Sequence, residues 1–230
     1  MINFSDAFYD AINIIFNLDT EFLEIIIISL QVSLSAMFFA VILTLPIASF
    51  LSVSNFIGKD IIIVIINALM ALPPVVVGLS LYLILSSQGF LGQYQLLYTV
   101  SAMILAQTII ILPIMISLSK ESIDYYYDEY KEYLFSINCS NSNIFYTLLW
   151  EARHKLTINI LAGLGRALSE VGAIIIVGGN IAHLTRTMTT GIVLETSRGD
   201  LPMALSLGIT LIAISLLINI VLYFTKIHEE

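Results

Sequence analysis

Two opposite charges, Arg166 and Glu170, lie inside an otherwise small and apolar stretch, AGLGRALSEVGAIIIVGGN, at residues 162–180. Residues four apart are neighbours on a helix, so the two side chains can form an ion pair. Ionisable side chains in apolar spans face a packed bundle or a watery cavity rather than lipid. Two interpretations follow. The pair fixes how this helix packs, or it borders a watery cavity.

Prolines and glycines mark further positions where a helix breaks or where backbones approach closely. Pro73 and Pro74 each remove a backbone donor inside an apolar run, and Gly78 follows one turn later. Ser169 and Gly172 lie beside the charged pair, in a stretch whose glycines allow close approach of another backbone. Either these residues border a cavity, or they serve only helix packing.

The sequence lacks the residue sets that are typical of enzymes and metal sites. It contains no G-x-x-x-x-G-K-[ST] phosphate loop, no H-E-x-x-H zinc motif and no G-x-S-x-G nucleophile motif. The single cysteine, Cys139, and the histidines at positions 154, 183 and 228 have no ligand-spaced partners. We therefore expect no catalytic residue, no metal ligand and no cofactor bound by this chain.

Composition indicates a membrane protein. Hydrophobic residues make up 58% of the 230 and charged residues 11%, and the mean hydropathy is +0.96. A soluble domain carries about 25% charged residues. The net charge of −8 leaves no basic face for a nucleic-acid partner.

The apolar runs predict an all-α integral membrane protein with one domain, 1–230. A helix needs roughly 20 apolar residues to cross a bilayer, where lipid leaves each backbone group to pair within its own segment. We expect five transmembrane helices, at 25–53, 61–85, 96–119, 156–182 and 201–225.

Residues 1–20 are too polar to cross a bilayer. Their apolar residues share one helical face, which predicts an amphipathic helix at the outer interface, although a flexible tail is the alternative. This face comprises Phe4, Phe8, Ile12, Ile15 and Phe16.

Positive charge predicts the orientation. Six Lys and Arg residues lie in the loop at Lys59, the segment 120–155 and the tail, against two in the opposite loops. The first set is therefore expected in the cytoplasm, with the N-terminus outside and the C-terminus inside.

The segment 120–155 is the largest hydrophilic element. It contains a helical stripe of apolar and aromatic side chains, with the acidic residues opposite, which either docks into a groove on another protein or packs on this chain's own spans. The stripe comprises Tyr126, Tyr130, Tyr133, Leu134 and Ile137.

The outer loop around residue 187 is rich in hydroxyls and carries cations. Either this loop presents hydroxyl and guanidinium donors to a ligand or partner outside, or it is simply solvated. The residues concerned are Arg186, Thr187, Thr189 and Arg198. Asp200, two residues before a proline, is suited to cap the last helix.

The segment 120–155 resembles the coupling loop of ATP-binding-cassette (ABC) importer permeases, whose pattern is Glu-Ala-Ala, three residues, then Gly. Glu132 keeps the glutamate and the spacing, whereas both alanines are replaced and Asn138 stands for the glycine. Asn also tolerates the left-handed conformation that ends a helix.

Three further segments resemble the molybdate- and tungstate-type permeases of this family, and the motifs WEAR, SEVGA, VGGNI and LETSRGD are most similar to the tungstate-specific branch. The segments are ALPPVVVGLSLYLILSSQGFLG (71–92), WEARHKLTINILAGLGRALSEVGAIIIVGGNI (150–181) and TRTMTTGIVLETSRGDLPMAL (185–205).

The resemblance implies a type I ABC importer permease fold in the plasma membrane. It implies a homodimer around one path, with an ABC ATPase subunit docked at residues 126–138 and binding the ATP. It also implies a periplasmic or lipid-anchored oxyanion-binding protein, which would face Arg186, Thr187, Thr189 and Arg198.

The resemblance places the charged pair beside the translocation path. There Arg166 would offer positive potential to a passing dianion while Glu170 sets its orientation, with a purely structural pair as the alternative. The path or gate would also be bordered by Pro73, Pro74, Gly78, Ser169 and Gly172.

The expected function is ATP-driven import of a tetrahedral oxyanion, tungstate ahead of molybdate. A permease for molybdate or sulfate is the alternative within transport. A stand-alone channel or a membrane enzyme is the alternative of another class.

Overall fold

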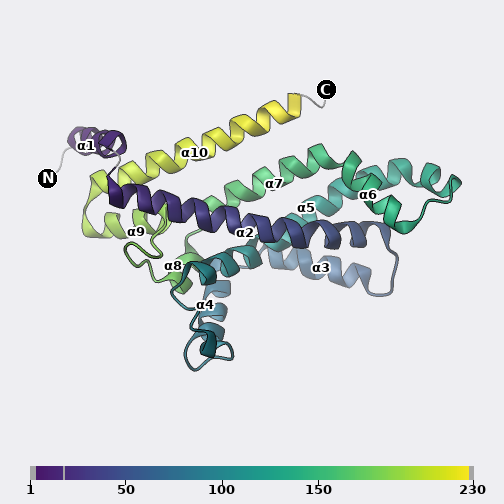
Figure 1. The fold of residues 1–230 in the computed structure, drawn as a ribbon, viewed down its shortest axis with the longest axis horizontal. Helices are drawn as coiled ribbons and strands as arrows, with labels where there is room; N and C mark the ends of the chain where they lie inside the picture. Colours follow the sequence, from purple (N-terminus) through teal and green to yellow (C-terminus); the bar gives the residue numbers. More distant parts are fainter. Residues whose placement is uncertain (1–3, 18, 228–230) are drawn as a thin grey trace.

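The computed structural model describes residues 4–17 and 19–227 (Figure 1). These residues form helices joined by short connections, and the predicted all-α fold is confirmed. The elements are α1 (Phe4–Asn17), α2 (Thr20–Val53), α3 (Lys59–Met70), α4 (Pro74–Leu85), the short 3-10 turn η1 (Gly92–Tyr94), α5 (Val100–Ser136), α6 (Asn141–Glu151), α7 (Arg153–Leu168), α8 (Gly172–Gly178), α9 (Met188–Arg198) and α10 (Leu201–Ile227).

Helices α2, α5 and α10 are each long and apolar enough to cross a membrane. The pair α3 and α4 meets at 99°, and the pair α7 and α8 at 58°, so the described residues provide up to five spans if each bent pair is one span. The predicted spans 61–85 and 156–182 are therefore not straight helices. The first is interrupted because the prolines at 73 and 74 supply no backbone donor.

Helix α5 does not end near residue 119, where the sequence analysis placed a span boundary. It continues through the hydrophilic residues to Ser136. An ion pair one turn apart, between Lys120 and Asp124 (2.5 Å), supports the helix where it becomes polar. The polar composition therefore marks a change of surroundings and not the end of the helix.

The molecule is elongated, with α6 at one end and α1 and α9 at the other (Figure 1), here called the α6 end and the α9 end. Helices α2 and α5 pack together along the middle. The central core joins α2, α4, α5 and α8 through Val32, Leu81, Met103 and Val177. At the α6 end, Ile123, Leu134, Leu148 and Leu156 join α5, α6 and α7.

The N-terminal segment is helical, as predicted, from Phe4 to Asn17. Its small residues Ala7 and Ala11 are buried, and the helix packs against α10. Phe8 and Phe16 are exposed, while the side chain of Phe4 lies outside the described part. A position at the membrane interface stays a prediction.

The turn between α5 and α6 has the geometry that the sequence predicts. Asn138 adopts a left-handed conformation, with φ of 49°. Its N–H donates to the carbonyl of Phe135 (3.0 Å), and the N–H of Cys139 donates to the carbonyl of Leu134 (3.1 Å). These two bonds satisfy carbonyls at the helix end.

Replacing Asn138 tests this turn. Asn138→Val should destabilise the protein by about 1–2 kcal/mol, because a branched residue is strained at this backbone angle, whereas Asn138→Gly should not. Thermal unfolding of the detergent-purified protein measures the difference, with Asn143→Val at an exposed helical position as the matched control. Equal unfolding temperatures for the two Asn138 variants would contradict the left-handed turn.

Candidate functional site

The predicted ion pair between Arg166 and Glu170 is confirmed, with Nη1 and Oε2 2.8 Å apart. The two residues do not share one continuous helix, because α7 ends at Leu168 and α8 starts at Gly172. The Glu170 side chain is 4% exposed and that of Arg166 is 38% exposed. The pair therefore spans a helix break, with its carboxylate inside the protein.

Side chains from other helices satisfy the backbone groups at this break. The hydroxyl of Thr189 donates to the carbonyl of Glu170 (2.8 Å), and the amide of Gln107 donates to the carbonyl of Ala167 (2.5 Å). The second carboxylate oxygen of Glu170 accepts from the N–H of Ala173 (3.4 Å) at the start of α8. Non-helical backbone at membrane depth persists only where such partners exist.

The break between α3 and α4 lies against the break between α7 and α8. A Cβ atom on Gly78 would be 2.8 Å from the Cα of Ala173, and one on Gly172 would be 2.8 Å from Cγ2 of Val75. Helices α4 and α8 are thus packed at backbone contact distance. We call these two helices the α4–α8 unit.

The predicted path residues are therefore brought together at two adjacent breaks. Pro73 precedes α4 and Pro74 is its first residue, where a missing N–H costs no hydrogen bond. Ser169 is exposed at the end of α7. The role of these residues in transport stays a prediction.

Arg166 and Glu170 face different spaces. Arg166 lines a cavity of about 90 Å³ together with Leu72, Pro113 and other apolar residues of α3, α4 and α5. Glu170 instead lines a void of about 10 Å³ among the hydroxyls of Ser29, Ser33, Thr187 and Thr189. The guanidinium is the member of the pair that a ligand could reach.

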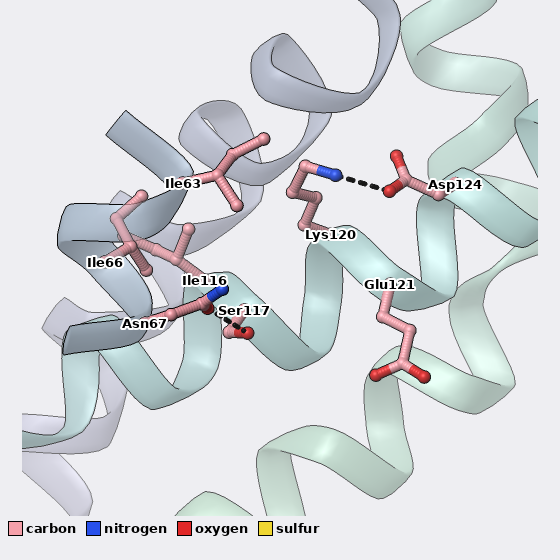
Figure 2. Close-up of a pocket in the computed structure, with 8 residues that line it drawn as sticks. All are labelled: Ile63, Ile66, Asn67, Ile116, Ser117, Lys120, Glu121 and Asp124. Carbon is pink, nitrogen blue, oxygen red and sulfur yellow. Dashed lines mark hydrogen bonds and ion pairs between the residues drawn. The ribbon is translucent and has the colours of Figure 1, made fainter. Parts of the chain in front are cut away.

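A second cavity, of about 210 Å³, lies between α3 and α5 (Figure 2). Lys120 is directed at Asp124, the hydroxyl of Ser117 donates to Oδ1 of Asn67 (3.1 Å), and Glu121 also lines the space. One lysine against two carboxylates makes this cavity net negative. It does not suit an anion.

The loop before α9 is folded into the protein, which corrects the prediction that Arg186, Thr187 and Thr189 form an outer contact surface. All three side chains are buried. Thr187 caps α9 by accepting from the N–H of Thr190 (3.4 Å), and Thr189 bonds to the break at Glu170. These hydroxyls are needed inside because the surrounding helix ends leave backbone groups without helical partners.

Arg186 is neutralised by acidic residues from two helices. Its Nη1 lies 2.8 Å from Glu21 of α2 and 3.6 Å from Glu195 of α9. Glu195 also pairs with Arg198 (3.1 Å), and the side chains of Arg198 and Glu21 are both exposed. Sequence reasoning missed these partners, since Glu21 precedes Arg186 by 165 residues.

Two further contacts lie close in sequence to α9, one at His183 before it and one at Asp200 after it. The Nδ1 atom of His183 lies 2.5 Å from Glu24, and hydrogen bonding to that carboxylate raises the pKa of His183. The predicted cap of the last helix is confirmed, because Oδ1 of Asp200 accepts from the N–H of Met203 (3.2 Å).

The stripe at the α6 end divides between two environments. Tyr126, Tyr130 and Leu134 pack with α6 in the core of that end. Tyr133 and Ile137 are exposed, beside exposed Glu132 and Asn138. Two aromatic residues outside the predicted stripe, Phe135 and Tyr146, are exposed here as well. We call Tyr133, Phe135, Ile137 and Tyr146 the hairpin patch.

Comparison with known proteins identifies the family. No family model matches the chain. The chain is 36% identical over 226 residues to the tungstate uptake system permease protein TupB of Peptoclostridium acidaminophilum, covering 98% of each protein. The chain belongs to the family of ABC transporter permeases.

Two further relatives agree. The permease is 37% identical over 205 residues to a probable anion ABC transporter permease protein of Haloferax volcanii, covering 87% of the permease and 88% of the relative. It is 34% identical over 221 residues to TupB of Campylobacter jejuni, covering 96% and 92%. With its long apolar helices, it is a multi-pass membrane protein.

A glycine substitution tests the contact between α4 and α8. Gly78→Ala should destabilise the purified permease by about 1–3 kcal/mol, because the new methyl group meets backbone atoms that cannot move aside. Gly165→Ala in α7 is the matched control, since a Cβ there meets nothing within 4 Å. Unfolding temperatures measure both. A Gly78→Ala permease as stable as the Gly165→Ala permease would refute the contact.

Proposed function

We propose that this permease is the membrane subunit of an ATP-driven importer for a tetrahedral oxyanion, with tungstate as the cargo. The similarity to TupB over 98% of both proteins carries this proposal. Two copies surround one path, and each binds an ABC ATPase subunit on the cytoplasmic side. An oxyanion-binding protein delivers the cargo outside, and no cofactor is bound by the permease itself.

The α6 end is the proposed docking site for the ATPase and lies in the cytoplasm, with the N-terminus outside. Exposed aromatic side chains are frequent anchors of protein interfaces, and the hairpin patch presents three of them. Beneath the patch, Tyr126, Tyr130 and Leu134 hold α5 and α6 together. Glu132 and Asn138 flank the contact.

The α4–α8 unit is the proposed gate. The two helices are in backbone contact with each other. Each is joined through a break to the helix that precedes it, α4 to α3 and α8 to α7. Pro73, Pro74 and Gly172 lie at these breaks. Gly78 allows the close contact between α4 and α8, because it has no side chain to separate them. ATP-driven movement of the partner subunits would tilt the unit and switch the path between its two openings.

Arg166 is the proposed contact for the passing dianion. Its guanidinium faces the cavity of about 90 Å³ beside the break, and Ser169 is exposed next to it. Pairing with Glu170 reduces the net positive charge, which suits a path that must release its cargo. On the outer side we retain Arg198 alone as a contact for the binding protein, because Arg186, Thr187 and Thr189 are buried.

Purification from native membranes in mild detergent tests the proposed function. An ABC ATPase should come with the tagged permease, and Tyr133→Asp should lower its recovery roughly tenfold by placing a charge in the interface. Tyr94→Asp is the matched control, because Tyr94 is 62% exposed and Tyr133 is 64% exposed, and Tyr94 lies in η1 after α4, away in sequence from α5 and α6. Vesicles with the complex and its binding protein should take up tungstate in preference to molybdate and sulfate.

A permease that purifies alone, whether or not Tyr133 is replaced, would contradict the docking site and support a channel or an enzyme. Preferential uptake of molybdate or sulfate would overturn the assignment of tungstate alone.

Arg166 is tested separately, by uptake at equal membrane abundance. Arg166→Gln should lower tungstate uptake roughly tenfold, the effect of losing one charge-assisted hydrogen bond, and Arg166→Lys should retain more of it. Because Arg166→Gln leaves Glu170 buried without its partner, the double variant Arg166→Gln with Glu170→Gln controls for folding. Full uptake by the double variant would limit the pair to helix packing.

A further inference from the structure

Helix α7 connects the two parts of the proposed mechanism. It begins at Arg153, directly after α6, and it ends at Leu168, next to the break that Arg166 and Glu170 span. A movement of the α6 end can therefore reach the break through α7. This transmission requires that the first turns of α7 are held to α5, so that α7 moves when α5 moves.

Lys155 makes one such contact. Its ammonium nitrogen lies 3.5 Å from the centre of the Tyr125 ring and 5.0 Å from that of Tyr126. Both distances are within the range of a cation–π interaction. The two tyrosines belong to the polar extension of α5, where Tyr126 also packs in the core of the α6 end.

Asn159, one turn later on the same face of α7, makes the next contact. Its amide donates to the carbonyl of Leu118 (3.0 Å) and to the hydroxyl of Ser122 (2.9 Å), both on α5. Lys155 and Asn159 thus fasten one edge of α7 to α5 at two points one helical turn apart. Lys155 supplies the contact nearer to the proposed ATPase.

We infer that Lys155 is a positioning residue that transmits movement of the α6 end to α7, by holding α7 to the rings of Tyr125 and Tyr126. This inference rests on the proposed function. Without the contact, the ATPase still docks and hydrolyses ATP, but less of its movement reaches the break. Lys155 therefore affects the amount of anion moved for each ATP hydrolysed.

The test uses the complete complex of permease, ATPase and binding protein in lipid vesicles, with tungstate uptake and ATP hydrolysis measured together. Lys155→Met keeps most of the stem but removes the charge, and should lower uptake per ATP by roughly two- to fivefold, the effect of losing one cation–π contact to an exposed ring such as that of Tyr125. Lys155→Arg should restore the ratio, because guanidinium also binds an aromatic face. Tyr125→Leu should lower it, and Tyr125→Phe should not.

Arg153→Met is the matched control. Arg153 lies over the ring of Trp150 (4.6 Å), a cation–π contact at the same end that joins neighbouring turns and does not reach α5. It should leave uptake per ATP unchanged.

An unchanged ratio for Lys155→Met, in a complex whose wild-type form imports tungstate, would overturn this inference alone. So would a reduced ratio that Lys155→Arg does not restore. A wild-type permease that binds no ATPase or moves no oxyanion would instead overturn the proposed function.

Discussion

The structure depends on satisfying backbone polar groups at two helix breaks inside an apolar protein. Lipid offers no hydrogen bonds, so each interruption needs partners from the protein. At the first break, proline occupies positions where a missing N–H does no harm. At the second, Glu170, Thr189 and Gln107 supply the partners. The burial of the hydroxyl-rich loop before α9 and of the Glu170 carboxylate follows from this requirement.

The sequence predicted features whose cause is local. Asn138 tolerates the left-handed turn, Asp200 caps the helix that follows it, and Arg166 is spaced to reach Glu170. It could not predict features that depend on distant partners. Thr189 belongs to a polar stretch that is typical of a solvated loop. It is buried because its hydroxyl donates to the carbonyl of Glu170, a contact that the sequence does not reveal.

The same limit applies to the helix boundaries and to the apolar and aromatic stripe in the segment 120–155. Polar residues after position 119 indicated the end of a span, although helix formation depends on backbone bonding and continues through them to Ser136. The stripe was one surface in the sequence, but α6 covers Tyr130 and leaves Tyr133 exposed. Which residues of an amphipathic helix meet a partner is decided by the element that folds back on it.

The central claim is that α4 and α8 move as one unit about the paired breaks. Spin-label distances measure this in the assembled complex with Cys139 replaced, at exposed sites on α3 (Val64), α4 (Leu83) and just after α8 (Ile181). Between the nucleotide-free and the ATP-trapped states, the distance from Val64 to Leu83 should change while that from Leu83 to Ile181 stays constant. A constant first distance, or an equal change in both, would contradict the account.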